Sequence, residues 1–455
     1  MFITFTGVGP EGALSEVPGF SDPFPLAFDQ NSTLIAQKKM NSVNIMMASS
    51  AEQLATWCNN MQRMAEQTRL GIPVTIGSDP RHGSTENPGA AIPTSFFSKW
   101  ASPLGLAATR DSVLVQEFGD IARQEYLAVG LRLALHPMAD LATEPRWARV
   151  NGTFGEDAFL SAKLTAAYVK GFQGDTLNRN SVACMTKHFS GGGPQADGMD
   201  AHFASGKGQA YPGNNFDYHV IPFSKGAIPA HTAQLMTYYG IPEGQSSEEV
   251  AFGFNKEIVT GLLRDSLGFD GVVCTDWGIV SDMFVKPASA WGVEELSVKQ
   301  RVKKVIDAGS DMFGGESIPE VLLELVEEGS ISVDRIDASV RRILRDKFVL
   351  GLFDDPYVDL KGLDLLANPD FMAKGKASQR KSMVLLKNDN NILPLAADTK
   401  IYLEGFTALD ADDEAFGVSY GQVVNNPAAA VLRCVQDLKQ ILPTLTAFGL
   451  NPPEL

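Results

Sequence analysis

The sequence predicts an α/β protein, a (β/α)8 barrel of the TIM type followed by the start of an α/β sandwich domain. Two observations carry the barrel prediction. Eight short apolar runs are spread over the first 315 residues, and segments with apolar residues at helical spacing separate several of them. Strands that alternate with helices form βαβ units and a parallel sheet. A doubly wound sheet is the alternative architecture for this pattern.

The eight runs are the predicted strands, at 1–5, 43–48, 72–79, 131–140, 182–189, 233–239, 269–277 and 310–315. In the seventh run, the apolar and β-branched stretch Val-Val-Cys-Thr leads directly into Asp276 and Trp277. A parallel strand that is buried on both faces is apolar throughout. A carboxylate at the end of such a strand is therefore either the N-cap of a helix or a chemically active group.

Helical spacing of apolar residues precedes three of the later runs and continues after the last one, at 113–130, 255–268, 294–309, 318–329 and 332–353. We expect the barrel to cover residues 1–353, without its N-terminal start because the first residues resemble a strand already under way. A linker is expected at 354–375. Residues 376–455 would begin a sandwich domain, with a helix leading into a short strand and turn at 377–395, a strand at 399–405 and a helix at 428–442. This stretch is too short for a complete domain of that type.

The composition argues against several classes of partner. Acidic residues outnumber basic ones by 54 to 38, a net charge of −16, which disfavours nucleic acid and anionic membrane surfaces. No run of eighteen apolar residues is present, so no transmembrane helix is expected. No signal peptide is visible at the first residues, and the sequence leaves compartment and oligomeric state open.

Neither the cysteines nor the histidines form a metal-binding motif. The four cysteines lie far apart with no CxxC pair, and they are Cys58, Cys184, Cys274 and Cys434. All six histidines lie between positions 82 and 231, but without an HxH or HExxH arrangement. We expect no metal and no organic cofactor, and a metal-dependent barrel hydrolase is a distant alternative.

Polar residues gather at the carboxyl ends of the predicted strands, the face where barrel enzymes carry their catalytic groups. They are Asp79 (third strand), Arg146 (loop after the fourth), Lys187 and His188 (fifth), Tyr239 (sixth), and Asp276 and Trp277 (seventh). Charged groups bind hydroxyls strongly, so the set suits a neutral ligand with many hydroxyls. Cleavage of a glycosidic bond needs an acid and a second carboxylate.

At these residues the sequence resembles glycoside hydrolase family 3. The matching segments occur in the family's order and cover roughly residues 65–400. They are SDPRHG (78–83), EPRWARVNGTFGED (144–157), TKHFSGG (186–192), GFDGVVCTDWG (268–278), RIDASVRRILRDKFVLGLFDDP (335–356) and VLLKNDNNILPL (384–395). The resemblance implies a (β/α)8-like barrel followed by a three-layer α/β sandwich. It also implies hydrolysis of β-linked sugars with retention, through a covalent intermediate.

The resemblance assigns a role to each matching residue. Asp276 would be the nucleophile. The residues that would hold the first sugar or lie beside it are Asp79, Arg146, Lys187, His188, Met236 and Tyr239, and Trp277 would flank the next sugar. The structural alternatives are an ion-pair role for Arg146, a core position for Tyr239 and a helix N-cap role for Asp276.

The general acid is left open. Many two-domain members use a glutamate on the second domain, whereas single-domain members acting on N-acetylglucosaminides use an Asp–His dyad after the fifth strand. Asp200 and His202 have this D-x-H relation here, two residues further along than in those members. An Asp–His pair can act as acid and base because the carboxylate orients the imidazole. Alternatively, 190–220 is only a long substrate-binding loop and the acid comes from elsewhere.

The sequence thus predicts an exo-acting, retaining β-glycosidase that removes terminal β-D-glucosyl residues from a carbohydrate substrate. A β-N-acetylglucosaminidase with the Asp–His dyad is one alternative. A sugar-binding or inactive fragment is another. Linkage and aglycone stay undetermined.

Overall fold

The computed structural model describes residues 1–16, 29–46, 48–83, 95–282 and 288–396. Eight parallel strands close into a barrel in the order β1-β10-β9-β7-β5-β4-β3-β2. They are β1 (Phe2–Thr6), β2 (Ser42–Ile45), β3 (Thr75–Ser78), β4 (Leu133–Ala134), β5 (Ala183–Phe189), β7 (Gln234–Thr237), β9 (Val272–Trp277) and β10 (Met312–Gly314). Each lies within a predicted run or extends at most one residue beyond it, although β4 covers only two residues of its run. The barrel prediction is confirmed, and the doubly wound alternative is wrong.

The strands are buried along their whole length, which explains why they are apolar rather than alternating. Neighbouring strands are in parallel register, for example Met236 of β7 opposite Cys274 of β9. The barrel closes where β1 pairs with β2 on one side and β10 on the other. Closure brings the carboxyl ends of all eight strands to one face, so residues far apart in sequence meet there.

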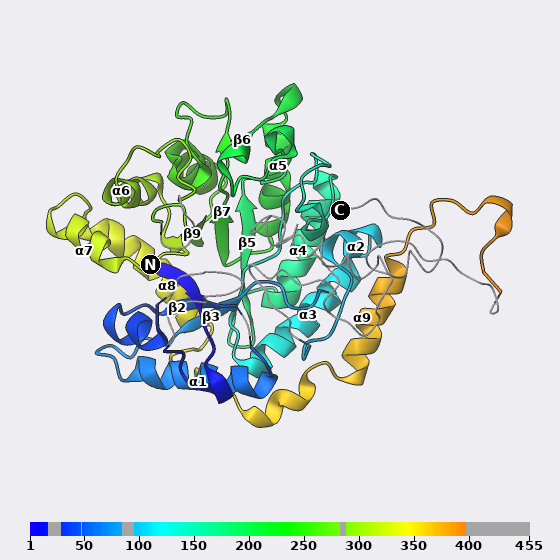
Figure 1. Cartoon of the computed structure of the whole chain (residues 1–455), viewed down its shortest axis with the longest axis horizontal. Helices are drawn as coiled ribbons and strands as arrows, with labels where there is room; N and C mark the ends of the chain where they lie inside the picture. Colours follow the sequence, from blue (N-terminus) through cyan, green and yellow to red (C-terminus); the bar gives the residue numbers. More distant parts are fainter. Residues whose placement is uncertain (17–28, 47, 84–94, 283–287, 397–455) are drawn as a thin grey trace, which may run out of the picture.

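Helices surround the barrel (Figure 1). They are α1 (Ala51–Glu66), α2 (Pro103–Ala108), α3 (Ser112–Val129), α4 (Ala158–Gln173), α5 (Phe216–Ile221), α6 (Val298–Ala308), α7 (Pro319–Glu327), α8 (Val333–Val349) and α9 (Pro369–Lys381). Side-chain caps begin several of them: Asp111 accepts from two backbone N–H groups of α3, and Ser297 forms a capping box with Gln300 at α6. The expected helix at 255–268 is instead a π-helix over Glu257–Ser266.

Two glycines let α3 and α4 pack closely. A Cβ atom on Gly171 would lie 2.7 Å from the Cα atom of Gly119 and 2.5 Å from the carbonyl oxygen of Gln116. No larger residue fits at this crossing without moving one helix, so the pair sets the distance between the two helices.

A short parallel ladder lies outside the barrel. β6 (Gly208–Gln209) pairs with β8 (Ile241–Pro242). β6 belongs to the long segment after β5, and β8 follows β7. The ladder therefore holds the expected 190–220 loop against the carboxyl end of the barrel.

Beyond the barrel, α9 begins inside the predicted linker 354–375, and a 3-10 helix spans Leu360–Leu365. The short strand expected after α9 is not formed, because residues 383–388 have no regular structure. Their apolar side chains are exposed, Leu386 at 90%. The strand expected at 399–405 and the helix at 428–442 lie outside the described residues, so the domain boundaries stay a prediction.

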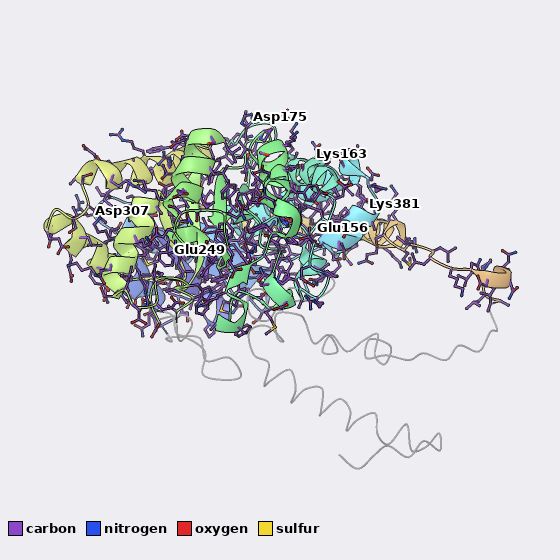
Figure 2. The ribbon with its side chains drawn as sticks, turned by 90° about the horizontal axis from the view of Figure 1, so that it is seen from above. Glu156, Lys163, Asp175, Glu249, Asp307 and Lys381 are labelled. Atoms are coloured by element: carbon purple, nitrogen blue, oxygen red, sulfur yellow. The ribbon has the colours of Figure 1, made fainter. Side chains whose placement is uncertain are left out.

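Charged side chains lie on the outside of the molecule, among them Glu156, Lys163, Asp175 and Glu249 (Figure 2). Within the described ranges, no helix is both long and apolar enough to cross a membrane. Cys58, Cys184 and Cys274 are buried free thiols, and Cys434 lies outside the described residues.

Candidate active site

Asp276 is next to last in β9 and is 6% exposed. Its Oδ1 atom accepts a hydrogen bond from the backbone N–H of Trp277 at 2.8 Å. Its Oδ2 atom is buried and has no hydrogen-bond partner among the described residues. Buried polar atoms are nearly always paired. This oxygen is therefore available to a bound molecule, and Asp276 caps no helix in the described structure.

His188, near the end of β5, faces this carboxylate. Its Nε2 atom lies 3.6 Å from Oδ2 of Asp276, and its Nδ1 atom lies 2.8 Å from Oδ2 of Asp140. Arg149 approaches Nε2 at 3.4 Å, and a guanidinium can only donate. Nδ1 is therefore the protonated nitrogen, donating to Asp140. Burial lowers the pKa of His188 and outweighs the Asp140 charge, which keeps the ring neutral.

Lys187 and Asp79 form a buried ion pair, with Nζ 2.7 Å from Oδ1. Asp79 directly follows β3, and its second oxygen accepts from Nδ2 of Asn44 on β2 at 3.0 Å. Strands β2, β3 and β5 of the barrel wall thus contribute to one hydrogen-bonded group. Both charges are neutralised locally, while their remaining hydrogen-bonding capacity suits hydroxyl groups of a ligand.

Tyr239 and Trp277 both lie beside Asp276. The Tyr239 hydroxyl accepts from the Trp277 backbone N–H at 3.1 Å, and burial, followed by the Asp276 charge, raises the Tyr239 pKa well above its usual value. The Trp277 indole packs against Phe5, and its Nε1 atom is buried without a partner in the described structure. Met236 is buried in β7. It pairs with Cys274 of the neighbouring strand β9, two residues before Asp276.

Asp200 and His202 are in direct contact. Nδ1 of His202 hydrogen-bonds to Oδ1 of Asp200, whose other oxygen accepts from Nε1 of Trp147 at 3.1 Å. Burial acts to raise the Asp200 pKa, but the His202 imidazole and Arg149 hold it below its usual range. The His202 ring lies 4.3 Å from the Tyr239 ring, between centroids. The pair is therefore one aromatic ring away from the end of β9.

Arg146 does not join this group. Its side chain is 65% exposed and binds Glu144, with Nη2 2.8 Å from Oε2. Arg149, three residues later, lies at the buried group instead. Burial acts to lower its pKa, but Tyr238, Asp200, Asp276 and Asp140 raise it on balance, and its Nη1 atom has no partner among the described residues.

No role in the site was predicted for Arg149, Asp140 or Asn44. Arg149 belongs to the same EPRWARV segment as Arg146, and Asp140 ends the fourth predicted run, so a signal existed for both. Asn44 lies inside an apolar run and gives no such signal. No group of three or more metal-ligating side chains occurs within the described ranges.

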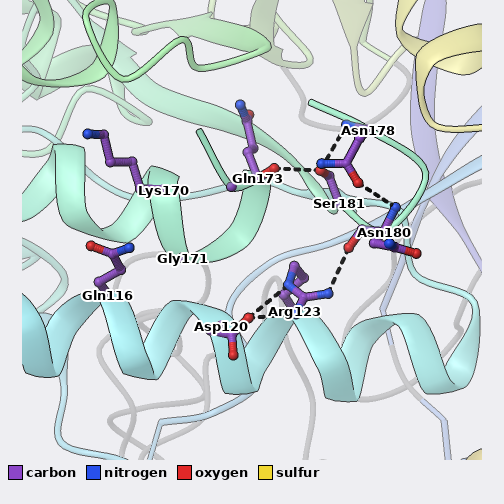
Figure 3. A pocket seen from close by; sticks show the side chains of 10 residues that line it. Gln116, Asp120, Arg123, Lys170, Gly171, Gln173, Asn178, Asn180 and Ser181 are labelled. Atoms are coloured by element: carbon purple, nitrogen blue, oxygen red, sulfur yellow. Dashed lines mark hydrogen bonds and ion pairs between the residues drawn. The ribbon is translucent and has the colours of Figure 1, made fainter. Parts of the chain in front are cut away.

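A separate cleft lies between α3 and α4, with a volume of about 370 Å³ (Figure 3). Arg123 in this cleft binds Asp120 and the backbone oxygen of Asn180. Residues 174–181 on its rim lead into the amino end of β5, away from the strand ends that carry Asp276. The polar group around Asp276 is the candidate active site, because it lies at the carboxyl ends of the strands and combines buried atoms of Asp276, Arg149 and Trp277 that are unpaired within the described structure with the carboxylates of Asp140 and Asp200.

Comparison with known proteins shows extensive similarity. The model of the glycosyl hydrolase family 3 N-terminal domain matches residues 27–345. β-Glucosidase C of Emericella nidulans is 52% identical over 384 residues, which are 82% of this chain and 62% of that protein. The periplasmic β-glucosidase/β-xylosidase of Dickeya chrysanthemi is 41% identical over 420 residues, 88% of this chain and 63% of that protein. The chain thus spans less than two thirds of the length of these relatives.

Among solved structures, the β-glucosidase of Listeria innocua in complex with isofagomine superimposes with a TM-score of 0.66 at 27% identity. The match covers 79% of this chain and 47% of that one. The family match over residues 27–345 includes strands β2 to β10 and the polar residues at their carboxyl ends.

Proposed function

Because the chain belongs to glycoside hydrolase family 3, we propose that it is an exo-acting, retaining β-glycosidase that removes terminal β-D-glucosyl residues. The observation that carries the proposal is the free Oδ2 atom of Asp276, buried at the end of β9 among polar groups suited to hydroxyls. In a double displacement, this oxygen attacks the anomeric carbon and the aglycone leaves with a proton from the acid. Water then gives a proton to the same acid/base group and attacks the glycosyl-enzyme, which releases the sugar and restores both the acid and the Asp276 carboxylate.

The other residues divide the remaining tasks. The Asp79–Lys187 pair, with His188 and Arg149, would bind the hydroxyls of the first sugar. Tyr239 and the buried Met236 would lie beside that sugar, and Trp277 would flank the next one. Holding the sugar at several points places its anomeric carbon at the nucleophile and lowers the entropic cost of reaction. Arg149 replaces Arg146 in this proposal, because Arg149 alone of the two reaches the buried group.

Asp200 and His202 are the proposed acid and base. Their contact supports this role, since Asp200 holds Nδ1 and leaves Nε2 of His202 as the nitrogen that exchanges a proton with the leaving group. The same contact favours the second candidate, a β-N-acetylglucosaminidase. The names of the relatives favour β-glucosides, and that of the Dickeya protein adds β-xylosides.

Intact-mass measurement after incubation with an activated 2-deoxy-2-fluoro-β-glucoside tests the nucleophile. The fluorine slows breakdown of the intermediate, and the good leaving group removes the need for an acid. We expect one fluoroglucosyl unit on the wild type and none on Asp276→Asn. Asp346→Asn is the control, because Asp346 is a buried carboxylate that binds Gln234 at the amino end of β7.

Comparing kcat/KM for an aryl β-glucoside, β-xyloside and β-N-acetylglucosaminide separates the β-glucosidase from the β-N-acetylglucosaminidase. Preference for the N-acetylglucosaminide would replace the β-glucosidase proposal with the second candidate. Calorimetric binding of glucose without an adduct or turnover on any of the three would show a sugar-binding fragment instead.

A further inference from the structure

Glu316 follows β10 and is fully buried, although it belongs to no ion pair in the described structure. Its Oε1 atom accepts from the backbone N–H groups of Val280 and Ser281, at 3.0 and 2.8 Å. Its Oε2 atom accepts from the Ser281 hydroxyl. Burial raises the pKa of this carboxyl to about 7, against these hydrogen bonds. The carboxyl thus binds the 278–282 turn, defined as the residues that directly follow β9.

Arg301 of α6 holds the same turn from the other side. Its Nη1 atom donates to the carbonyl oxygen of Val280 at 3.2 Å, and Nε donates to that of Val293 at 3.2 Å. The peptide groups around Val280 are therefore bound through both their donors and their acceptors. A turn fixed in this way cannot shift without losing several buried hydrogen bonds, each costly to leave unmade.

The turn is joined to both halves of the proposed catalytic machinery. At its start, Gly278 follows Asp276 and Trp277, and its backbone N–H donates to Gly314 at 3.0 Å. The carbonyl oxygen of Gly278 accepts from the backbone N–H of Ser289 at 3.2 Å. Two residues after Ser289, Nε1 of Trp291 donates to the carbonyl oxygen of Ala201 at 2.7 Å. Ala201 lies between Asp200 and His202.

We propose that Glu316 is a positioning residue that fixes the nucleophile Asp276 and the Asp200–His202 pair relative to each other through the 278–282 turn and Trp291. The inference rests on the proposed function. Glu316 is not itself the acid, because it is fully buried and both oxygens are engaged by the turn. Its effect is mechanical: misplacement of reacting groups by about 1 Å can cost on the order of 100-fold in rate.

The test compares Glu316→Ala and Glu316→Gln with wild type, using aryl β-glucosides of good and poor leaving ability. Glu316→Ala frees the turn, and kcat/KM with the poor leaving group should fall between about 10- and 100-fold. The loss should be smaller with the good leaving group, which needs no acid. Glu316→Gln should recover most of the rate, because its amide oxygen accepts both N–H bonds and its NH2 group donates to the Ser281 hydroxyl.

Two further variants keep the test decisive. Asp346→Asn also alters a buried carboxylate and should change Tm but not kcat/KM. Trp291→Phe keeps an aromatic ring and removes the N–H donor to Ala201. It should therefore lower kcat/KM selectively for the substrate with the poor leaving group, even where Glu316→Ala does not fold. Wild-type rates for both leaving groups in folded Glu316→Ala, or in Trp291→Phe, would overturn the inference and leave the proposed function intact. A wild type inactive on every β-glucoside would overturn the proposed function and this inference with it.

Discussion

The Nε2 atom of His188 lies 3.6 Å from the Oδ2 atom of Asp276, too far for a hydrogen bond, and it carries no proton of its own. The imidazole therefore lies against the carboxylate without neutralising it. Asp140 maintains this arrangement by accepting from Nδ1 on the opposite side of the ring. Asp276 thus faces a neutral imidazole and the Arg149 cation, and its Oδ2 atom stays available to the reacting carbon.

Asp140→Asn should lower kcat/KM by about 10- to 100-fold, the range typical for losing a residue that orients an active-site histidine. Asparagine has only one acceptor oxygen, so its NH2 group must face either Nδ1 of His188 or the backbone N–H of Gly192, and the ring loses a well-fitted partner that sets its tautomer. Steady-state kinetics with an aryl β-glucoside, with circular dichroism to establish folding, measure the effect. Unchanged kcat/KM in the folded variant would show that the orientation of His188 does not depend on Asp140.

Arg149→Met should reduce activity far more than Arg146→Met. Arg149 is the cation beside Asp140, Asp200 and Asp276, and its loss leaves three buried carboxylates without it. Arg146 interacts with Glu144 at the surface, where an ion pair contributes little. Comparison of kcat and KM for the two variants decides between the arginines. A larger loss for Arg146→Met would restore the role that the sequence motif suggested.

The Asp79–Lys187 pair should behave as a coupled unit in stability. Lys187→Met leaves the Asp79 carboxylate buried with Asn44 as its one side-chain partner among the described residues, and we expect it to destabilise the fold by about 3–5 kcal/mol. Adding Asp79→Asn removes the uncompensated charge and should recover much of that loss. Chemical denaturation of wild type, both single variants and the double variant gives the four unfolding free energies of a double-mutant cycle. Additive single losses would mean that the two charges do not stabilise each other.

His202→Ala should affect substrates according to their leaving groups. An aryl glycoside with a good leaving group departs without protonation and should lose little rate in the glycosylation step. A poor leaving group should lose about 100-fold or more, the usual contribution of a general acid. Presteady-state or kcat/KM measurements report this step. Equal losses for both substrates would remove Asp200 and His202 from the acid role.

Glu316 should make the stability of the fold depend on pH. Its native pKa lies near 7, above the ordinary value of 4.5, because burial outweighs both the hydrogen bonds from the turn and the charge of Arg301. Between these two values the native state binds more protons than the unfolded state, so stability falls as pH rises. The fall is on the order of 3 kcal/mol, complete above pH 7. Thermal unfolding of wild type and Glu316→Gln from pH 4 to 8 checks this, since the glutamine variant should lack the slope.

Local patterns were sufficient for the fold. Each barrel strand is a short apolar run, because both faces of a parallel strand are buried, and the helices between them carry their own caps, as at Ser297. One expectation was wrong, because the apolar residues 383–388 form no strand. The helix expected at 255–268 is present, as a π-helix over Glu257–Ser266. Strand formation needs a neighbouring strand as well as β-forming residues, and residues 383–388 pair with none in the described structure.

The barrel, the family resemblance and the polar residues that end the strands could all be predicted, because they follow from residue type and spacing along the chain. The folded structure was needed to show which arginine of EPRWARV is buried, that Asp140 holds His188, and that Glu316 binds a turn 35 residues before it. The physical reason is that loop paths and barrel closure set these contacts. Distances between residues on separate strands become fixed only when the eight strands meet.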